Sequence, residues 1–347
     1  MNAKRSPAAP AAKHRISIAL QGGGSHGAFS WGVLDRLLED GRIEVDGVSG
    51  TSAGAVNATV LAFGLASGGR DGARRALEAF WRRIADWAQV SPLQATSLDR
   101  MMGCGNMNLS PGWLMFDYLT RFFSPYQLNP CNVNLLRDVL LEMVDFELLQ
   151  HSSTVKLFLC ATNVLSGRMR VFANREISLQ AVLASSCLPH LFQAVEIDGE
   201  YYWDGGYMGN PPIYPLIYET DSCDVMIIRV NPIRIPHVPT MASEILDRVN
   251  SLSFNSSLMR EMRAIDFVTR LIDEGALDRE RYRRIFVHSI DAEQEMARLG
   301  VSSKFNVSWD FVRQLFALGR ESADVWLTTH FDALGQRSSI DIADAFL

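Results

Sequence analysis

Cysteine is scarce in this sequence, and the few cysteines are not arranged in pairs. The 347 residues contain 5 cysteines, and no two of them form a C-x-x-C pattern. Disulfide frameworks and the common zinc-binding patterns use closely spaced cysteines, so we expect neither, and we expect a reduced, intracellular protein. The sequence predicts no bound metal and no cofactor.

Long apolar segments and an excess of positive charge are also missing. No apolar run is long enough to span a membrane, and the run nearest the N-terminus, residues 16–20, is too short for a signal peptide. The formal net charge of -6 at pH 7 gives no support for a nucleic-acid partner. We therefore predict a cytoplasmic protein whose contact with a membrane, if it has one, is peripheral. The oligomeric state stays open.

Hydrophobic residues make up 48% of the chain, which is enough for a substantial core. Predicted buried strands cover residues 15–21, 155–161 and 224–230. Helical segments alternate with these strands, which favours an α/β fold with a mostly parallel sheet covered on both faces. The predicted divisions of the chain are a disordered tail over 1–14, a main domain over 15–231 with an insertion at about 91–130, and a mainly helical extension over 232–347 that packs on the main domain.

Residues Gly50 to Gly54 have the pattern G-x-S-x-G, with Ser52 at the centre. A serine at a sharp turn from a strand into a helix has its hydroxyl lifted away from the backbone, close to the positive end of the helix dipole. The two glycines lack a Cβ, which such a strained turn and a closely passing helix require. The pattern predicts a nucleophile at Ser52, although an ordinary glycine-rich turn has the same pattern.

A second glycine-rich loop follows the first predicted strand and precedes a helix. Its glycines fit G-x-G-x-x-G through Gly22, Gly24 and Gly27, and Asp46 has roughly the position of the acidic residue in a dinucleotide-binding domain. In the rival interpretation, successive glycines turn their N–H groups toward one point and form an oxyanion hole. A nucleotide site gives no reason for an exposed Ser52 nearby, whereas acyl transfer needs a nucleophile and donors together, so the two loops favour the oxyanion hole.

No histidine has a convincing position as a base for the predicted nucleophile. Three later histidines fit structural positions better: His237, His288 and His330. The better candidate is Asp204, which is followed by Gly205 and Gly206 after a predicted hairpin. A free aspartate has a pKa of about 3.9, and burial beside aromatic neighbours would raise it toward the range of a useful base.

These three motifs resemble, in sequence and in order, those of the patatin-like phospholipase family, over roughly residues 15–230. Further matches are Ala184, Ser185, Ser186, Pro189, Phe192, Asn210 and Pro211. The resemblance implies a three-layer α/β/α fold and a Ser–Asp dyad. The implied roles are Ser52 as nucleophile, Asp204 as base, Gly22, Gly23 and Gly24 as oxyanion hole, and Gly27, Gly50, Gly54, Gly205 and Gly206 as supporting glycines. The family usually has Lys or Arg where this chain has His26, which leaves the charge near the glycine loop open.

The resemblance also implies a lipid acyl hydrolase. Such an enzyme cleaves carboxylic esters of phospholipids or acylglycerols, as a phospholipase A does, through an acyl-enzyme intermediate. The alternatives are a nucleotide-binding protein that uses Gly22 to Gly27 and, among hydrolases, an acyl thioesterase or a polyester depolymerase. The sequence identifies neither the lipid nor the acyl position that is cleaved.

The insertion at about 91–130 leaves the alternation of strands and helices. It is rich in Met and aromatic residues, has few charges, and is interrupted by glycines and prolines. Long irregular insertions are often lids, and this composition suits an acyl-chain pocket or a membrane interface, although burial in the core is the competing interpretation. We expect residues 113–123 to form a mobile cover over Ser52 that touches the lipid. The expected substrate contacts are Trp113, Leu114, Phe116 and Phe123.

Overall fold

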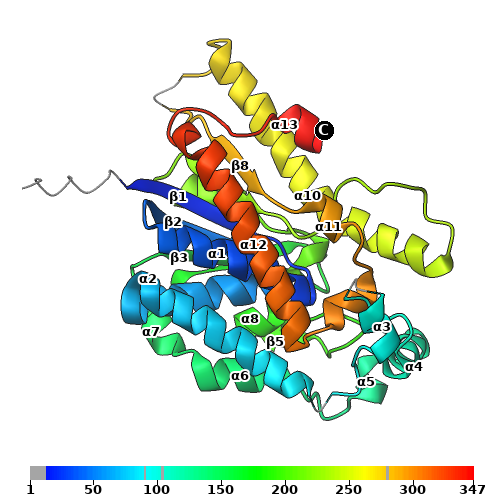
Figure 1. Cartoon of the computed structure of the whole chain (residues 1–347). Coiled ribbons are helices and arrows are strands. Elements are labelled where there is room, and N and C mark those ends of the chain that lie inside the picture. Colours follow the sequence, from blue (N-terminus) through cyan, green and yellow to red (C-terminus); the bar gives the residue numbers. More distant parts are fainter. Residues whose placement is uncertain (1–12, 90, 103–104, 279–280) are drawn as a thin grey trace, which may run out of the picture.

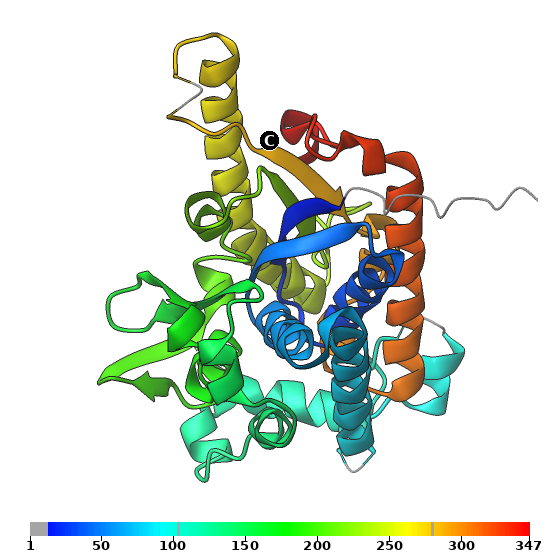
Figure 2. The same ribbon diagram turned by 90° about the vertical axis from the view of Figure 1, so that its left-hand side faces the viewer.

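An eight-stranded sheet forms the centre of the computed structural model, which describes residues 13–89, 91–102, 105–278 and 281–347 (Figures 1 and 2). Its strand order is β5-β6-β3-β2-β1-β7-β8, and β4 also pairs with β3. The strands are β1 His14–Leu20, β2 Ile43–Gly50, β3 Lys156–Asn163, β4 Met169–Ala173, β5 Val195–Ile197, β6 Glu200–Asp204, β7 Asp224–Ile228 and β8 Phe286–Ile290. Most of the predicted tail lies outside the described residues, and His14, its last residue, begins β1.

The central strands run parallel, as predicted. Strand β2 is parallel to β3 and β1, and β7 is parallel to β1 and β8, whereas β4 and β6 are antiparallel to β3. Side chains of β1 alternate between two cores: Ile16, Ile18 and Leu20 join one apolar cluster, and Ala19 joins the other. Both faces of the sheet are therefore buried, which explains the nearly continuous apolar sequence of this strand.

Helices cover each face of the sheet (Figures 1 and 2). The core on one face includes α1 Gly27–Asp40, α2 Ala53–Ala88 and α12 Trp309–Thr329. The core on the other face includes α9 Tyr214–Glu219, α10 Ala242–Asp273 and α13 Ile342–Phe346. This arrangement confirms the predicted three layers and the helical C-terminal region. That region also contributes β8 to the sheet.

Shorter elements connect these layers. The remaining helices are α3 Ser97–Met101, α4 Pro111–Phe122, α5 Pro125–Leu128, α6 Leu135–Met143, α7 Phe146–His151, α8 Leu179–Ser185 and α11 Glu293–Met296. The 3₁₀ turns are η1 Gly24–His26, η2 Asn174–Glu176, η3 Gly205–Tyr207, η4 Val301–Phe305 and η5 Phe331–Ala333. Within the described ranges, no helix combines the length and the apolar character needed to cross a bilayer.

Helix α12 of the C-terminal region packs directly on α1. A Cβ on Gly32 would lie 2.1 Å from the carbonyl oxygen of Phe316, and a Cβ on Gly319 would lie 2.1 Å from that of Phe29. Real Cβ atoms do not approach backbone so closely, so only glycine fits at either position. The two backbones therefore touch where the helices cross.

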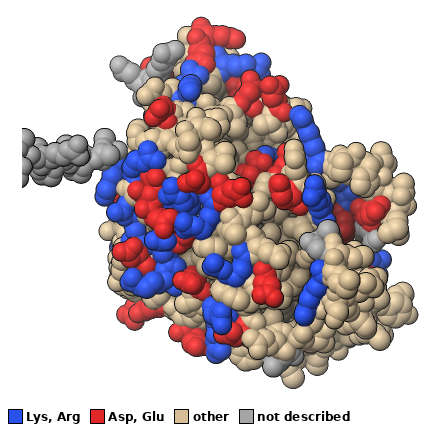
Figure 3. Space-filling view, in the orientation of Figure 1, with Lys and Arg blue, Asp and Glu red and all other residues tan. Residues whose placement is uncertain are grey.

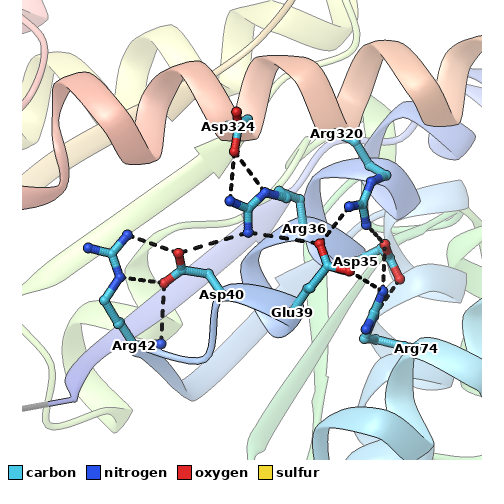
Figure 4. A network of polar contacts seen from close by, with 8 residues as sticks. All are labelled: Asp35, Arg36, Glu39, Asp40, Arg42, Arg74, Arg320 and Asp324. Atoms are coloured by element: carbon cyan, nitrogen blue, oxygen red, sulfur yellow. Dashed lines mark hydrogen bonds and ion pairs between the residues drawn. The ribbon is translucent and has the colours of Figure 1, made fainter. Parts of the chain in front are cut away.

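A network of ion pairs extends this contact (Figure 4). It consists of Asp35, Arg36, Glu39, Asp40, Arg42, Arg74, Arg320 and Asp324. The largely buried carboxylate of Asp35 pairs with Arg74 of α2 at 2.8 Å and with Arg320 of α12. Removing one partner of a buried charge is costly, on the order of 3–5 kcal/mol, so this network links α1, α2 and α12 strongly.

Candidate active site

Ser52 lies at the turn between β2 and α2, where the G-x-S-x-G pattern predicts it. Its backbone angles are φ 55° and ψ -126°, in a region that residues with a side chain rarely occupy. The Ser52 N–H donates to the carbonyl and to the hydroxyl of Ser185, each at 3.1 Å. These contacts hold the strained turn in place, with the side chain at the N-terminus of α2.

The flanking glycines meet the steric requirement that the sequence predicted for them. A Cβ on Gly54 would lie 2.1 Å from the carbonyl oxygen of Leu20, and a Cβ on Gly50 would lie 2.4 Å from that of Gly54. Helix α2 therefore passes directly against the end of β1, and this close approach brings Ser52 next to the loop that follows β1. Gly27, in that same loop, faces the start of α2.

The glycine loop after β1 lines the same cavity as Ser52. The Gly22 N–H donates to Asn210 Oδ1 at 2.7 Å, and the Gly22 carbonyl accepts from Asn231 Nδ2 at 2.7 Å. Among the described residues, no hydrogen bond uses the N–H of Gly23 or Gly24. These two amides are therefore available as donors, whereas that of Gly22 is engaged and fixes the position of the loop.

Asp204 ends β6 opposite Ala161 of β3, and it is 1% exposed. Its Oδ1 accepts the N–H of Gly206 at 2.8 Å, while Oδ2 has no hydrogen-bond partner among the residues that the structure describes. Gly205 lies against the backbone of β3, where a Cβ would be 2.2 Å from the carbonyl oxygen of Cys160. One oxygen of the carboxylate is thus fixed by the Gly206 N–H, and the other accepts no hydrogen bond from the described residues in this geometry.

Burial raises the pKa of Asp204 to about 6, against smaller lowering effects of the Gly206 N–H, the Ser52 hydroxyl and Lys304. The group is therefore ionised at neutral pH and is more basic than an exposed aspartate. A carboxylate of this kind, beside a serine hydroxyl and two free amide donors, can accept a proton from the serine while the amides receive a negative oxygen.

One histidine, His190, lines the cavity, and its side chain is exposed. The sequence interpretation did not consider His190 as a base, and no hydrogen bond joins it to Ser52 among those of the described residues. Six histidines lie outside the cavity lining: His14, His26, His151, His237, His288 and His330. The buried His288 pairs with Asp224 at 2.9 Å, which agrees with the structural role predicted for it.

His26, which the resemblance set against a Lys or Arg, is buried and does not line the cavity. Its Nε2 bonds to the Ser303 hydroxyl at 2.8 Å. That hydroxyl donates to the carbonyl of Gly300 at 2.6 Å, so His26 Nε2 is the donor. Burial, together with Lys304, lowers the pKa of His26 to about 3, and the side chain is neutral at physiological pH.

The cavity over Ser52 and Asp204 has a volume of about 630 Å³. Apolar side chains that line it include Trp113, Phe116, Leu188, Leu191, Phe254 and Phe305. The rings of Trp113 and Phe116 contact the ring of Phe305, with centroids 5.3 and 5.5 Å away. A mostly apolar wall with a polar reaction centre suits a substrate that has a hydrocarbon chain.

Two of the four predicted substrate contacts lie in this wall and two do not. Residues 113, 116, 117, 120 and 121 of α4 line the cavity with the spacing of one helix face. Leu114 faces away from the cavity and is 55% exposed, and Phe123, just after the helix, is 44% exposed. The sequence interpretation treated this segment as irregular, but residues 111–122 form a regular helix. The helical repeat turns Trp113 and Phe116 toward the cavity, whereas Leu114 and Phe123 lie outside its lining.

Three residues that contribute to the site were assigned no function from the sequence, although Asn210 was among the residues that match the family. Asn210 and Asn231 fix the glycine loop, and Lys304 donates to Asn231 Oδ1 at 2.9 Å. Asn231 follows the carboxyl end of β7, and ligands often bind at that edge of a parallel sheet. Its position in the sequence could therefore have identified it as a residue of the site. Lys304 lies in a short 3₁₀ turn far along the chain, and no local pattern marks it.

Asp46 does not have the role that a dinucleotide site would require. Its carboxylate accepts the N–H groups of Asp221 and Ser222 at 2.7 and 3.0 Å and pairs with Arg15 at 2.9 Å. The side chain is buried and occupied in holding a turn, and it is not part of the cavity lining. The structure therefore removes Asp46 as support for nucleotide binding, and the glycine pattern alone is left for that alternative.

The sequence and fold were compared with those of known proteins. The family profile described as "Patatin-like phospholipase" matches residues 18–217. Similar solved structures include VipD from Legionella pneumophila, with 20% identity and a TM-score of 0.36, where the match covers 89% of this chain and 67% of that chain. Another is a chain of the heterodimeric ExoU-SpcU complex from the type III secretion system of Pseudomonas aeruginosa, with 17% identity and a TM-score of 0.31, covering 93% of this chain and 61% of that chain. No curated protein matches significantly.

Proposed function

This chain belongs to the patatin-like phospholipase family, and from that premise we propose that it is a serine acyl hydrolase that cleaves carboxylic esters of lipids, as a phospholipase A does. The observation that carries the proposal is that the strained Ser52 and the free Oδ2 of Asp204 line one largely apolar cavity with the glycine loop. Phospholipids and acylglycerols both offer the ester and the acyl chain that such a cavity suits.

In the proposed reaction, Asp204 takes the proton of Ser52 as Ser52 Oγ bonds to the ester carbonyl carbon. The N–H groups of Gly23 and Gly24 stabilise the negative oxygen of the tetrahedral intermediate. The bond to the alcohol then breaks, and Asp204 returns the proton to the leaving oxygen. Water next gives a proton to Asp204 and attacks the acyl-enzyme. The bond between the acyl carbon and Ser52 Oγ then breaks, Asp204 returns the proton to Ser52 Oγ, and the fatty acid is released.

A fluorophosphonate probe tests the proposal directly, because it labels only activated serines. We expect covalent labelling of the wild-type protein at Ser52, and no labelling of Ser52→Ala. Competition by a lipid ester should slow the labelling. An unlabelled, folded wild-type protein that binds ATP or NAD would instead support the nucleotide-binding alternative.

Gly24→Ala should lower kcat by about 10²-fold, the effect of losing one oxyanion donor, with little change in KM. Gly24 has φ +61°, and a Cβ there would lie 2.4 Å from the carbonyl oxygen of Lys304, so the loop must shift and turn its amides away. Gly167→Ala is the matched control, since Gly167 has φ +66° but open space around it. Steady-state kinetics on a soluble ester checks the result, and an effect confined to KM would contradict it.

We propose that α4 is the cover of the site and that its outer face contacts the lipid surface. Apolar side chains on that outer face are Leu114, Met115, Tyr118 and Phe122, all largely exposed. The surface over α3 to α5, at the lower right of Figure 3, has few charged side chains compared with the left half of the molecule. Apolar patches of this kind often mark membrane or partner contacts.

The double variant Leu114→Ser, Met115→Ser should lower hydrolysis of phospholipid vesicles about tenfold or more, because each side chain contributes ~1.5 kcal/mol or more when buried. Hydrolysis of a short soluble ester should not change, since both residues face away from the cavity. Val325→Ser, at an exposed apolar residue of α12, serves as the control. Equal losses on both substrates, with a lower melting temperature, would contradict the lipid contact.

A further inference from the structure

Lys304 brings a positive charge into the cavity from outside the region that matches the family. It lies in η4, beyond residues 18–217, and it lines the cavity together with Ser52 and Asp204. Its ammonium group donates to Asn231 Oδ1 at 2.9 Å, the only hydrogen bond of that group among the described residues. The same ammonium group lies 6.0 Å from the centre of the Phe254 ring, which also lines the cavity.

The segment that carries Lys304 also holds the glycine loop. The Ser25 hydroxyl donates to the carbonyl of Ser303 at 2.7 Å, and His26 bonds to the hydroxyl of the same residue. The carbonyl of Lys304 lies against Gly24. Asn231 completes the connection, because it bonds to Lys304 through Oδ1 and to the Gly22 carbonyl through Nδ2.

Among the described residues, Lys304 is the cation whose charge lowers the pKa of Asp204. Burial raises the pKa of the other titratable groups around Asp204, which stay neutral at physiological pH: Cys160, Cys187 and Tyr207. His26 is neutral as well. Facing Lys304 from α10 is Asp247, and further out on α4 Arg121 pairs with Asp117 at 2.9 Å.

Burial lowers the pKa of Lys304, and the carboxylates of Asp247 and Asp204 act in the opposite direction. Lys304 in turn lowers the pKa of Asp204. Each charged form therefore stabilises the other inside the cavity, where water screens the interaction less than at the surface.

We propose that Lys304 is a positioning residue of the acyl-transfer site, which lines the cavity together with Asp204 and, through Asn231, fixes the glycine loop. The proposal rests on the proposed hydrolase function and extends it, since it makes the C-terminal segment part of the site. His26 of the glycine motif is neutral and supplies no positive charge near the loop. In this proposal Lys304 of η4 supplies that charge instead.

The test compares Lys304→Gln and Lys304→Arg with a matched control, Lys156→Gln. Gln keeps an N–H donor but has no charge, whereas Arg keeps the charge. Lys156 lies at the start of β3, outside the cavity lining, so its replacement serves as the control. The measurement is kcat and KM for a short neutral ester as a function of pH. A neutral soluble substrate excludes effects on lipid binding.

For the wild type we expect an acid limb near pH 6, set by Asp204. In Lys304→Gln the midpoint should move to higher pH, because the loss of a nearby cation raises the pKa of a carboxyl group. At pH 6, kcat should then fall severalfold, at pH 8 it should recover, and KM should stay constant. Lys304→Arg and Lys156→Gln should keep the wild-type limb.

A folded Lys304→Gln protein with the wild-type acid limb would overturn the proposal. If Lys304→Gln does not fold, Lys304→Arg decides, and a shifted limb in that variant would also overturn it. Failure of the hydrolase function itself is a separate result, because the wild type would then neither hydrolyse esters nor react with a fluorophosphonate.

Discussion

Ser52→Ala should abolish ester hydrolysis, with a loss on the order of 10⁴- to 10⁶-fold in kcat. The substitution removes the oxygen that would form the acyl-enzyme, and no other group in the cavity lining is placed to replace it in the proposed mechanism. The N–H bonds of residue 52 to Ser185 stay possible, so the turn and the fold should survive. The rate on a soluble ester and the melting temperature together check this result.

Ser49→Ala is the matched control for the nucleophile. Ser49 is buried in β2, three residues before Ser52, and its hydroxyl has no hydrogen-bond partner among the described residues. Loss of that hydroxyl should change neither the rate nor the melting temperature much. A folded Ser52→Ala protein with nearly normal activity would rule out the hydrolase assignment.

Asp204→Asn should lower kcat by about 10³- to 10⁴-fold, the range for loss of a general base. Asn has nearly the same shape and can still accept the Gly206 N–H, so the geometry of the η3 turn should persist. It cannot take a proton from Ser52 near neutral pH. The wild-type activity should fall below about pH 6, as Asp204 becomes protonated, and this acid limb should be absent from the residual activity of Asp204→Asn.

His190→Gln is the most informative control for the base, since His190 also lines the cavity. We expect this variant to keep most of the wild-type kcat. The same is expected for Gln at His237, His288 and His330, which are three of the six histidines outside the lining. A folded His190→Gln protein as inactive as Asp204→Asn would replace the proposed dyad by one that includes a histidine.

The sequence was sufficient to predict the turns of the site, because their requirements are local. A strained serine turn needs glycine at fixed positions around it, and the structure places Gly50 and Gly54 where any Cβ would collide with backbone. The parallel sheet was predictable for a similar reason. Strands such as β1, buried on both faces, have apolar sequences that stand out from the amphipathic helices between them.

The other parts of the site depend on contacts between residues far apart in the chain. Lys304 reaches the cavity only because η4 packs on the glycine loop, and nothing in the residues around it indicates that contact. The sequence did not predict which side chains of α4 face the cavity, because glycines and prolines in the surrounding insertion indicated an irregular segment. Once α4 is known to be a helix, its period alone separates Trp113 and Phe116 from Leu114.

The crossing of α1 and α12 has a consequence for the time at which activity arises. Gly32 and Gly319 bring the two backbones together, and Asp35 shares its charge with Arg74 and Arg320. During synthesis the ribosome releases α1 long before α12. The apolar face of α1 that packs against α12 therefore stays exposed until α12 has been synthesised. Both glycine motifs and Asp204 are translated before α12, and the nascent chain cannot complete its core until α12 has been synthesised. The packing of the layer that contains α1 is therefore finished only after all the residues of the proposed site have left the ribosome.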